Sequence, residues 1–285
     1  MRRAIVTAVV LGVVITLAFS LRDALAPVTP VACTTTANNL SVVLSPEQTA
    51  NAATIAGVAV RRGLPPRAAT IAIATAMQES KLVNLAYGDL DSLGLFQQRP
   101  SQGWGTRAQV LDPVHSANAF YDALVKIKGY GSMSITAVAQ QVQHSGYPQA
   151  YAQHEPQARA LASALTGYSP AALTCALDPS HRPAGSAGPG RLSEAMVRDQ
   201  PPHPATALAG RAGVRVRTGA GAPAWAFAQW SVARADQLGV ARVYVDGQVW
   251  SRAGRDQGWT PAAGPGVPAK GSGEVVVLFT DTTPA

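Results

Sequence analysis

The sequence predicts a mainly α-helical fold that ends in a small α+β unit. Helix-capping patterns, and prolines at first helical positions, recur between residues 45 and 167. A stretch rich in Pro, Gly, Ala and Ser follows at 176–210 and indicates a flexible linker. Beyond the linker, short alternating segments indicate strands, so residues 211–285 are expected to form a small α+β domain.

The helices between residues 45 and 167 are predicted from their start and stop signals. Ser45 and Gln48 match a capping box, with Pro46 at the first helical position, and Gly63 is expected to end that helix. No strong strand pattern competes here, apart from a possible short hairpin between residues 84 and 98. Four more helices are expected over the following ranges: 66–80, 113–129, 134–146 and 148–166.

The C-terminal unit has its own pattern of elements. Residues 225–238 have an amphipathic helical pattern, and Asp246-Gly247 is a hairpin signal between two strands. We therefore expect a helix packed on a small mixed sheet. Its strands are expected at the following ranges: 214–218, 240–245, 248–250 and 274–279.

The N-terminus indicates export. Two arginines precede eighteen uncharged residues, 4–21, which is just long enough to span a bilayer as a helix. The basic residues keep their end inside, so the chain after Leu21 should face outward. We expect residues 1–22 to form an uncleaved membrane anchor. The alternative is a cleaved signal peptide with a site at Ala24-Leu25-Ala26, although Pro27 should hinder cutting.

The chain has two cysteines, Cys33 and Cys175, and both lie outside the membrane on this topology. In an oxidising compartment such a pair predicts one disulfide. The bridge would close residues 33–175 into one helical domain. Two unrelated thiols are the alternative.

Several classes of function are disfavoured. The net charge of +7 is spread along the chain without a basic run, so no nucleic acid partner is expected. The five histidines show no metal-ligand spacing, so no metal is expected. A glycine pattern at 219–224 outlines a dinucleotide fingerprint, but the unit of about 75 residues is half a usual cofactor domain. No cofactor is therefore expected.

Glu79 is the first candidate for chemistry. It follows a stretch without charged side chains, 68–78, which should form a buried helix. Partial desolvation and the negative end of the helix dipole should both raise the pKa of a carboxyl at this point. Such a carboxyl can donate a proton near neutral pH, as cleavage of a glycosidic bond requires. An exposed glutamate in a fraying last turn is the plain alternative.

The residues after Glu79 carry a family resemblance. Glu79-Ser80, followed by Ser92-x-Gly94-Leu95-Phe96-Gln97-x-x-Pro100, resembles the signature of lytic transglycosylases and goose-type lysozymes. The resemblance covers about residues 45–167, and the stretch also looks like a group of actinobacterial membrane-anchored proteins. Three features depart from the family pattern. Phe96 stands at a Met position, and the loop is a few residues short. The Ala-Tyr-Asn-Ala-Gly motif has only a rough counterpart, in which Gln143 and His144 fall at the Tyr-Asn pair.

The resemblance implies a lysozyme-like helical domain and one glutamate used twice. Glu79 would protonate the oxygen between N-acetylmuramic acid and N-acetylglucosamine, helped by the neighbouring acetamido group. It would then remove the proton of the C6 hydroxyl and give a 1,6-anhydro end. Hydrolysis would instead need a second carboxylate, for which Asp89 and Asp91 are weaker candidates. The plain alternative for both aspartates is a turn.

The loop after Glu79 and the segment near residue 150 supply candidate sugar contacts. Amides suit hydroxyl groups and aromatic rings suit stacking, although Trp104 could equally fill the core. The candidates are the following residues: Ser80, Ser92, Gly94, Phe96, Gln97, Gln98, Trp104, Tyr147 and Tyr151.

The sequence therefore predicts a protein of the cell envelope that cleaves peptidoglycan glycan strands. The alternative is a scaffold that binds the same strands without cleaving them, because a fold does not guarantee activity. The C-terminal domain could bind wall polymer or a protein partner, and the sequence leaves that partner open.

Overall fold

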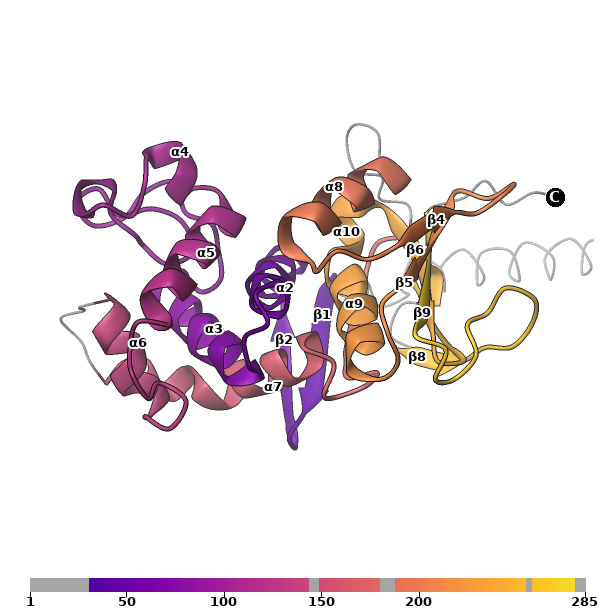
Figure 1. Cartoon of the computed structure of the whole chain (residues 1–285), viewed down its shortest axis with the longest axis horizontal. Helices are drawn as coiled ribbons and strands as arrows, with labels where there is room; N and C mark the ends of the chain where they lie inside the picture. Colours follow the sequence, from indigo (N-terminus) through magenta and orange to yellow (C-terminus); the bar gives the residue numbers. More distant parts are fainter. Residues whose placement is uncertain (1–30, 144–148, 180–187, 255–257, 280–285) are drawn as a thin grey trace, which may run out of the picture. The chain divides into compact units, whose positions relative to one another are not determined.

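The computed structural model describes residues 31–143, 149–179, 188–254 and 258–279 (Figure 1). Residues 31–285 form one compact unit. The predicted anchor, residues 1–22, lies outside the described residues. Among the residues that are described, no helix combines the length and hydrophobicity needed to cross a membrane.

The structure is an α+β fold, so the prediction of a mainly α fold is wrong. It has two antiparallel sheets, one of three strands in the order β2-β1-β3 and one of six in the order β4-β5-β9-β6-β7-β8. The smaller sheet was not predicted. Its strands are the following: β1 (Ala32–Ala37), β2 (Leu40–Leu44) and β3 (Leu173–Ala176).

The missed sheet has a simple physical explanation. In β1 the buried positions are Cys33, Thr35 and Ala37. These side chains are small or polar, so the strand lacks the apolar alternation by which a half-buried strand is predicted. The strand pairs β2 over five positions through a two-residue turn, Asn38-Asn39, in which both residues have positive φ. That geometry is the common two-residue hairpin connection.

The predicted disulfide is confirmed. Cys33 and Cys175 are directly paired across β1 and β3, are almost fully buried, and are bonded over a separation of 142 residues. A buried bridge of this kind forms and persists in oxidising compartments. The disulfide therefore indicates an extracytoplasmic or secreted protein.

The helices of the first part begin as predicted in several places. The Ser45 capping box is confirmed, since its side chain accepts from the Gln48 amide and the Gln48 side chain accepts from the Ser45 amide. Proline occupies the first turn of the next long helix as well. The helices are the following: α2 (Pro46–Arg61), α3 (Pro66–Ser80), η1 (Pro100–Gln102), α4 (Arg107–Val110), α5 (Pro113–Leu124), α6 (Ile135–Gln143), η2 (Ala152–His154) and α7 (Glu155–Leu165).

The second part is built on the six-stranded sheet, which is antiparallel throughout and not mixed. Its hairpin at Asp246-Gly247 is confirmed between β6 and β7. Within the range predicted as a linker, the structure has helix α8 and strand β4. The elements are the following: α8 (Pro189–Asp199), β4 (Ala205–Ala207), β5 (Gly213–Arg217), α9 (Ala222–Ala233), α10 (Ala235–Leu238), β6 (Val240–Val245), β7 (Gln248–Ser251), η3 (Arg252–Gly254), β8 (Trp259–Pro261) and β9 (Glu274–Phe279).

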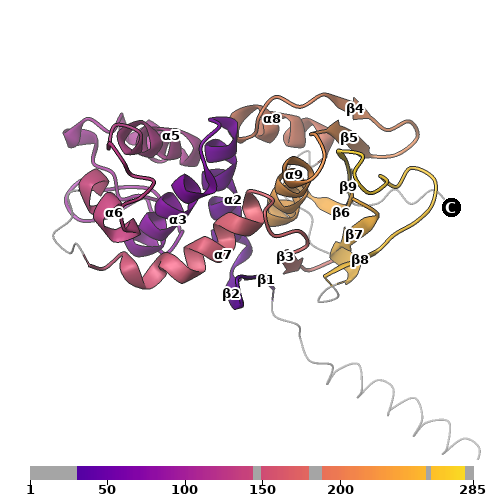
Figure 2. The ribbon, with the colours of Figure 1, turned by 60° about the horizontal axis from the view of Figure 1, so that its bottom comes forward.

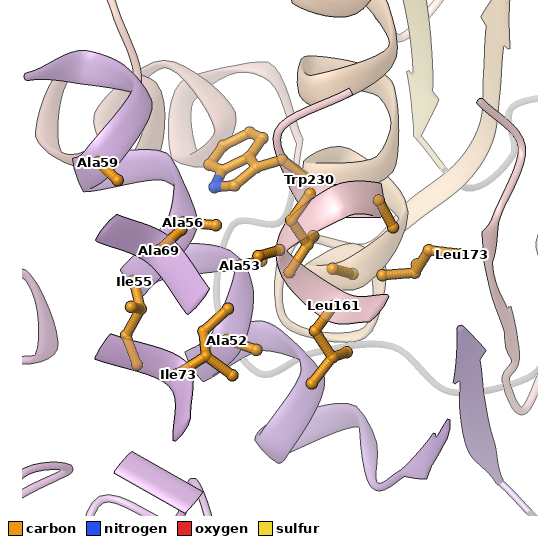
Figure 3. Close-up of a cluster of buried hydrophobic side chains, with 14 of the residues drawn as sticks. Ala52, Ala53, Ile55, Ala56, Ala59, Ala69, Ile73, Leu161, Leu173 and Trp230 are labelled. Atoms are coloured by element: carbon orange, nitrogen blue, oxygen red, sulfur yellow. The ribbon is translucent and has the colours of Figure 1, made fainter. Parts of the chain in front are cut away.

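Helix α9 joins the two parts into one core. It contacts α2, α7 and β3 as well as β6 and β9, and its residues from Ala224 to Ala233 are all buried. Figure 3 shows Trp230 of this helix close to Ala56 and Ala59 of α2. The helix is therefore buried on all faces rather than amphipathic, because both of its sides carry packed elements.

A buried amide fixes this junction. Gln229 accepts a hydrogen bond from Leu173 N at 2.8 Å and donates to Ala164 O and Ser169 O, at 2.7 and 3.1 Å. Its side chain is completely buried, so these bonds satisfy polar atoms that water does not reach. The C-terminal part is thus bonded to the end of α7 and to β3.

Candidate active site

The candidate site lies at the C-terminal end of α3, where Glu79 is the second-last helical residue. The predicted burial of residues 68–78 is confirmed from Ala68 to Ala76, whereas Met77 and Gln78 are half-buried. The helix ends because Lys81 adopts the left-handed conformation, with φ of 54°. The Ser80 hydroxyl contacts Ala76 O at 3.0 Å and Leu95 O at 2.8 Å, and so ties the helix end to the following loop.

The Glu79 carboxylate is half-buried and accepts a hydrogen bond from the Tyr151 hydroxyl at 2.7 Å. Burial raises the pKa of this carboxyl above its usual value, whereas hydrogen bonding from Tyr151 and Gln143 lowers the pKa to a smaller extent. Among the described residues, no Lys, Arg or His forms an ion pair with Glu79. The carboxyl is therefore suited to hold a proton at a higher pH than an ordinary glutamate.

Three parts of the chain contact this helix end: the loop of residues 92–100 (the motif loop), the segment that begins at Tyr151, and α6. Tyr151 is fully buried immediately before η2, and the following residues Gln153 and His154 both contact Gln78 Oε1, at 3.2 and 3.1 Å. Burial lowers the pKa of His154, which favours its neutral form. These contacts hold the Tyr151 segment against the end of α3.

The third element is α6, whose last residue is Gln143. Its side-chain amide donates to Phe96 O at 2.7 Å and also lies within hydrogen-bonding reach of Glu79. Gln143 therefore links the acid, α6 and the motif loop. Sequence reasoning placed Gln143 at the rough counterpart of the third family motif but did not include it among the site residues. That motif position was the signal that could have found it.

The motif loop is built mainly by buried side chains. Phe96 is completely buried and its ring stacks on Phe120 with centroids 4.7 Å apart. Gln98 is 2% exposed and donates to Ser116 O at 3.2 Å. Ser92 is also buried. In this structure the ring of Phe96 and the amide of Gln98 support the loop from inside, out of reach of a ligand.

The backbone of the loop depends on a glycine. Gly94 has φ of +75°, and a Cβ at this position would lie 2.5 Å from Val110 O. Its amide donates to Leu85 O at 2.7 Å in an isolated antiparallel bridge. In place of the short hairpin predicted between residues 84 and 98, the structure has isolated bridges. Gln97 is partly exposed, and its amide contacts Gly94 O at 3.2 Å. Gln97 is thus more exposed than the buried candidates Ser92, Phe96 and Gln98 in the same loop.

The two aspartates have different surroundings. Asp91 binds Arg99 at 2.7 Å and both the amide and the hydroxyl of Ser101, at 2.8 and 2.9 Å, and these contacts hold its pKa well below the usual range. Both carboxylate oxygens are therefore occupied. Asp89 lies in an exposed turn, where its carbonyl accepts from Ser92 N. Neither arrangement indicates a base held beside Glu79.

The remaining candidates are less informative. Trp104 is half-buried and packs against the core, while its carbonyl lies 3.4 Å from His115 Nε2. Tyr147 lies outside the described residues. Within the described ranges, no group of three or more His, Cys, Asp or Glu side chains could hold a metal ion.

Neither a scan against protein-family models nor a search of curated proteins finds a match to this chain. The geometry around Glu79 and the motif resemblance are therefore the two indications of function.

Proposed function

We propose that the protein cleaves the bond between N-acetylmuramic acid and N-acetylglucosamine in peptidoglycan, with Glu79 as the general acid. The observation that carries the proposal is the Glu79 carboxyl itself. It ends a buried helix, its pKa is raised by burial, and Tyr151 fixes one of its oxygens. A glycosidic oxygen is a poor leaving group unless it is protonated, and a carboxyl with a raised pKa can supply that proton.

The surroundings of Glu79 suit a carboxyl that acts twice. After protonating the leaving oxygen, the carboxylate would be stabilised by hydrogen bonding from Tyr151 and Gln143. It could then remove the proton of the C6 hydroxyl, so that the hydroxyl oxygen closes on the anomeric carbon. The products would be a 1,6-anhydro end and a free N-acetylglucosamine end, and no water would be consumed.

The state of Asp91 favours this reaction over hydrolysis. An inverting hydrolase needs a second carboxylate free to activate water. The oxygens of Asp91 are bonded to Arg99 and Ser101. A carboxylate with a strongly lowered pKa is also a weak base.

Release of soluble fragments from purified peptidoglycan tests the proposal. Acid–base help of this kind contributes about a hundred- to ten-thousand-fold in rate, so Glu79→Gln should release fragments at least about a hundredfold more slowly. Glu194→Gln, which alters an exposed carboxylate on α8, is the matched control and should leave the rate unchanged. Retention of the full rate by Glu79→Gln would overturn the proposal. Binding of both proteins to the wall without any release would instead favour a glycan-binding scaffold.

A further inference from the structure

A pocket lies beside the N-terminal part of α3. Its volume is about 760 Å³, within the range of small-molecule sites. It is formed where the β1–β2 turn, the first turn of α3 and one face of α7 meet, and Tyr168 closes it just beyond α7. None of its lining residues belongs to the motif loop.

Several residues that line the pocket lie along α7. Helices α3 and α7 lie side by side (Figure 2). They are antiparallel, because Gln78 near the end of α3 contacts His154 before α7, whereas Thr70 early in α3 and Ser163 late in α7 both line the pocket. The lining residues on α7 extend from Glu155 to Ser163, a span of roughly 12 Å at 1.5 Å per helical residue, and Ala152 of η2 adds to that end. Ala152 is next to Tyr151, so one end of the pocket begins beside the segment that holds Glu79.

The charged side chains of the pocket leave one cation available. Arg159 is bonded to Glu155 on the same helix, which neutralises that pair. Arg67 donates to Met133 O through Nη2, its Nε is buried without an acceptor among the described residues, and it forms no ion pair within them. The first turn of α3 adds a partial positive charge next to Arg67, because no side chain caps this helix.

The other walls combine apolar surface with amides. Leu40, Pro66 and Pro156 provide apolar contact, and Tyr168 presents its ring with 67% of the residue exposed. The Asn38-Asn39 turn brings amide side chains to the rim. A mostly apolar cavity with a few placed polar groups and one available cation matches an extended ligand that carries amides and a carboxylate.

We infer that this pocket binds the carboxylate-bearing peptide stem of peptidoglycan, with Arg67 as the carboxylate contact and Tyr168 as an apolar contact. The inference rests on the proposed function, since it names the part of the same polymer that would be held away from Glu79. Stem binding here would favour polymer that carries peptides over bare glycan.

Calorimetric titration of the full-length Glu79→Gln protein tests the inference without turnover. The probe is the free tetrapeptide stem, compared with the same peptide whose carboxylates are converted to amides. We expect saturable binding of the acid form, weakened about tenfold or more by Arg67→Gln and also weakened by Tyr168→Ala. Tyr168 is exposed, so that variant should fold normally. Arg242→Gln, an exposed position on β6, is the matched control and should bind as the parent does.

The outcomes separate the two proposals. Equal binding of the acid and amide peptides, or unchanged affinity in both pocket variants, would overturn the pocket assignment. If the wild-type protein then still released fragments from peptidoglycan, the proposed function would stand without it. Pocket-dependent binding combined with no release would support the stem site and overturn catalysis.

Discussion

Replacement of Phe96 by alanine distinguishes a core residue from a sugar contact. The ring is fully buried and stacks on Phe120 at 4.7 Å. Truncation of a buried phenylalanine costs about 3–5 kcal/mol, because the transfer energy of the ring is lost and a cavity remains. Phe96→Met keeps a large apolar side chain at this position, so it should cost less than about 1.5 kcal/mol.

The free energy of unfolding would be measured by urea denaturation of the oxidised protein, with fragment release measured in parallel. Tyr87→Ala is the control, because Tyr87 is 73% exposed near the same loop and its removal should change stability by no more than about 0.5 kcal/mol. A Phe96→Ala protein as stable as the wild type, but with weaker glycan binding, would refute the packing role.

Three further predictions concern the replacement of single residues. Tyr151→Phe removes a hydrogen bond that lowers the pKa of Glu79, so the pKa of Glu79 should rise further. The basic limb of the pH profile of kcat/KM should then move to higher pH, and an unmoved limb would argue against Glu79 as the acid. The pKa of Asp91 is held low by its contacts, so these contacts stabilise the fold above the ordinary aspartate pKa, and that stabilisation is lost as the pH falls. Asp91→Asn should therefore lower the Tm near neutral pH but not in acid. It should leave the reaction products unchanged. Gln229→Leu should destabilise the whole unit by roughly 1–3 kcal/mol for each buried backbone group left unsatisfied. The variant should still unfold in one transition. Two separate unfolding transitions would argue against a shared core.

Elements with strong local signals could be predicted from the sequence. The Ser45 capping box, the prolines that begin α2 and α3, and the Asp246-Gly247 hairpin each depend on contacts within a few residues. The disulfide followed from cysteine number and compartment. Strands β1 and β3 could not be predicted, because they pair across more than 130 residues and the buried side chains of β1 are small or polar.

The candidate site was only partly predictable for a related reason. The position of Glu79 at the end of a buried helix follows from residue pattern alone. The direction of each side chain in the motif loop does not, and for this reason Phe96 and Gln98 were expected at the sugar although the structure buries them. The role of Tyr151 and Gln143 depends on the packing of η2 and α6 against α3, which is a long-range contact.

The domain boundaries remain predictions, but the structure shows how the parts are joined. Helix α9 is buried between the first part and the six-stranded sheet, and Gln229 bonds it to α7 and β3. Asp199 at the end of α8 is completely buried and paired with Arg234 at 2.7 Å. These contacts join the two parts within the single compact unit of residues 31–285.

Mass spectrometry of the fragments released from purified peptidoglycan tests the central claim most directly. The full-length wild-type protein and its Glu79→Gln variant would be compared under the same conditions. If Glu79 carries out both steps, the wild type releases fragments with 1,6-anhydro ends and the variant releases none. Free reducing ends from the wild type, or the same anhydro products from the variant, would contradict the assignment of both steps to Glu79.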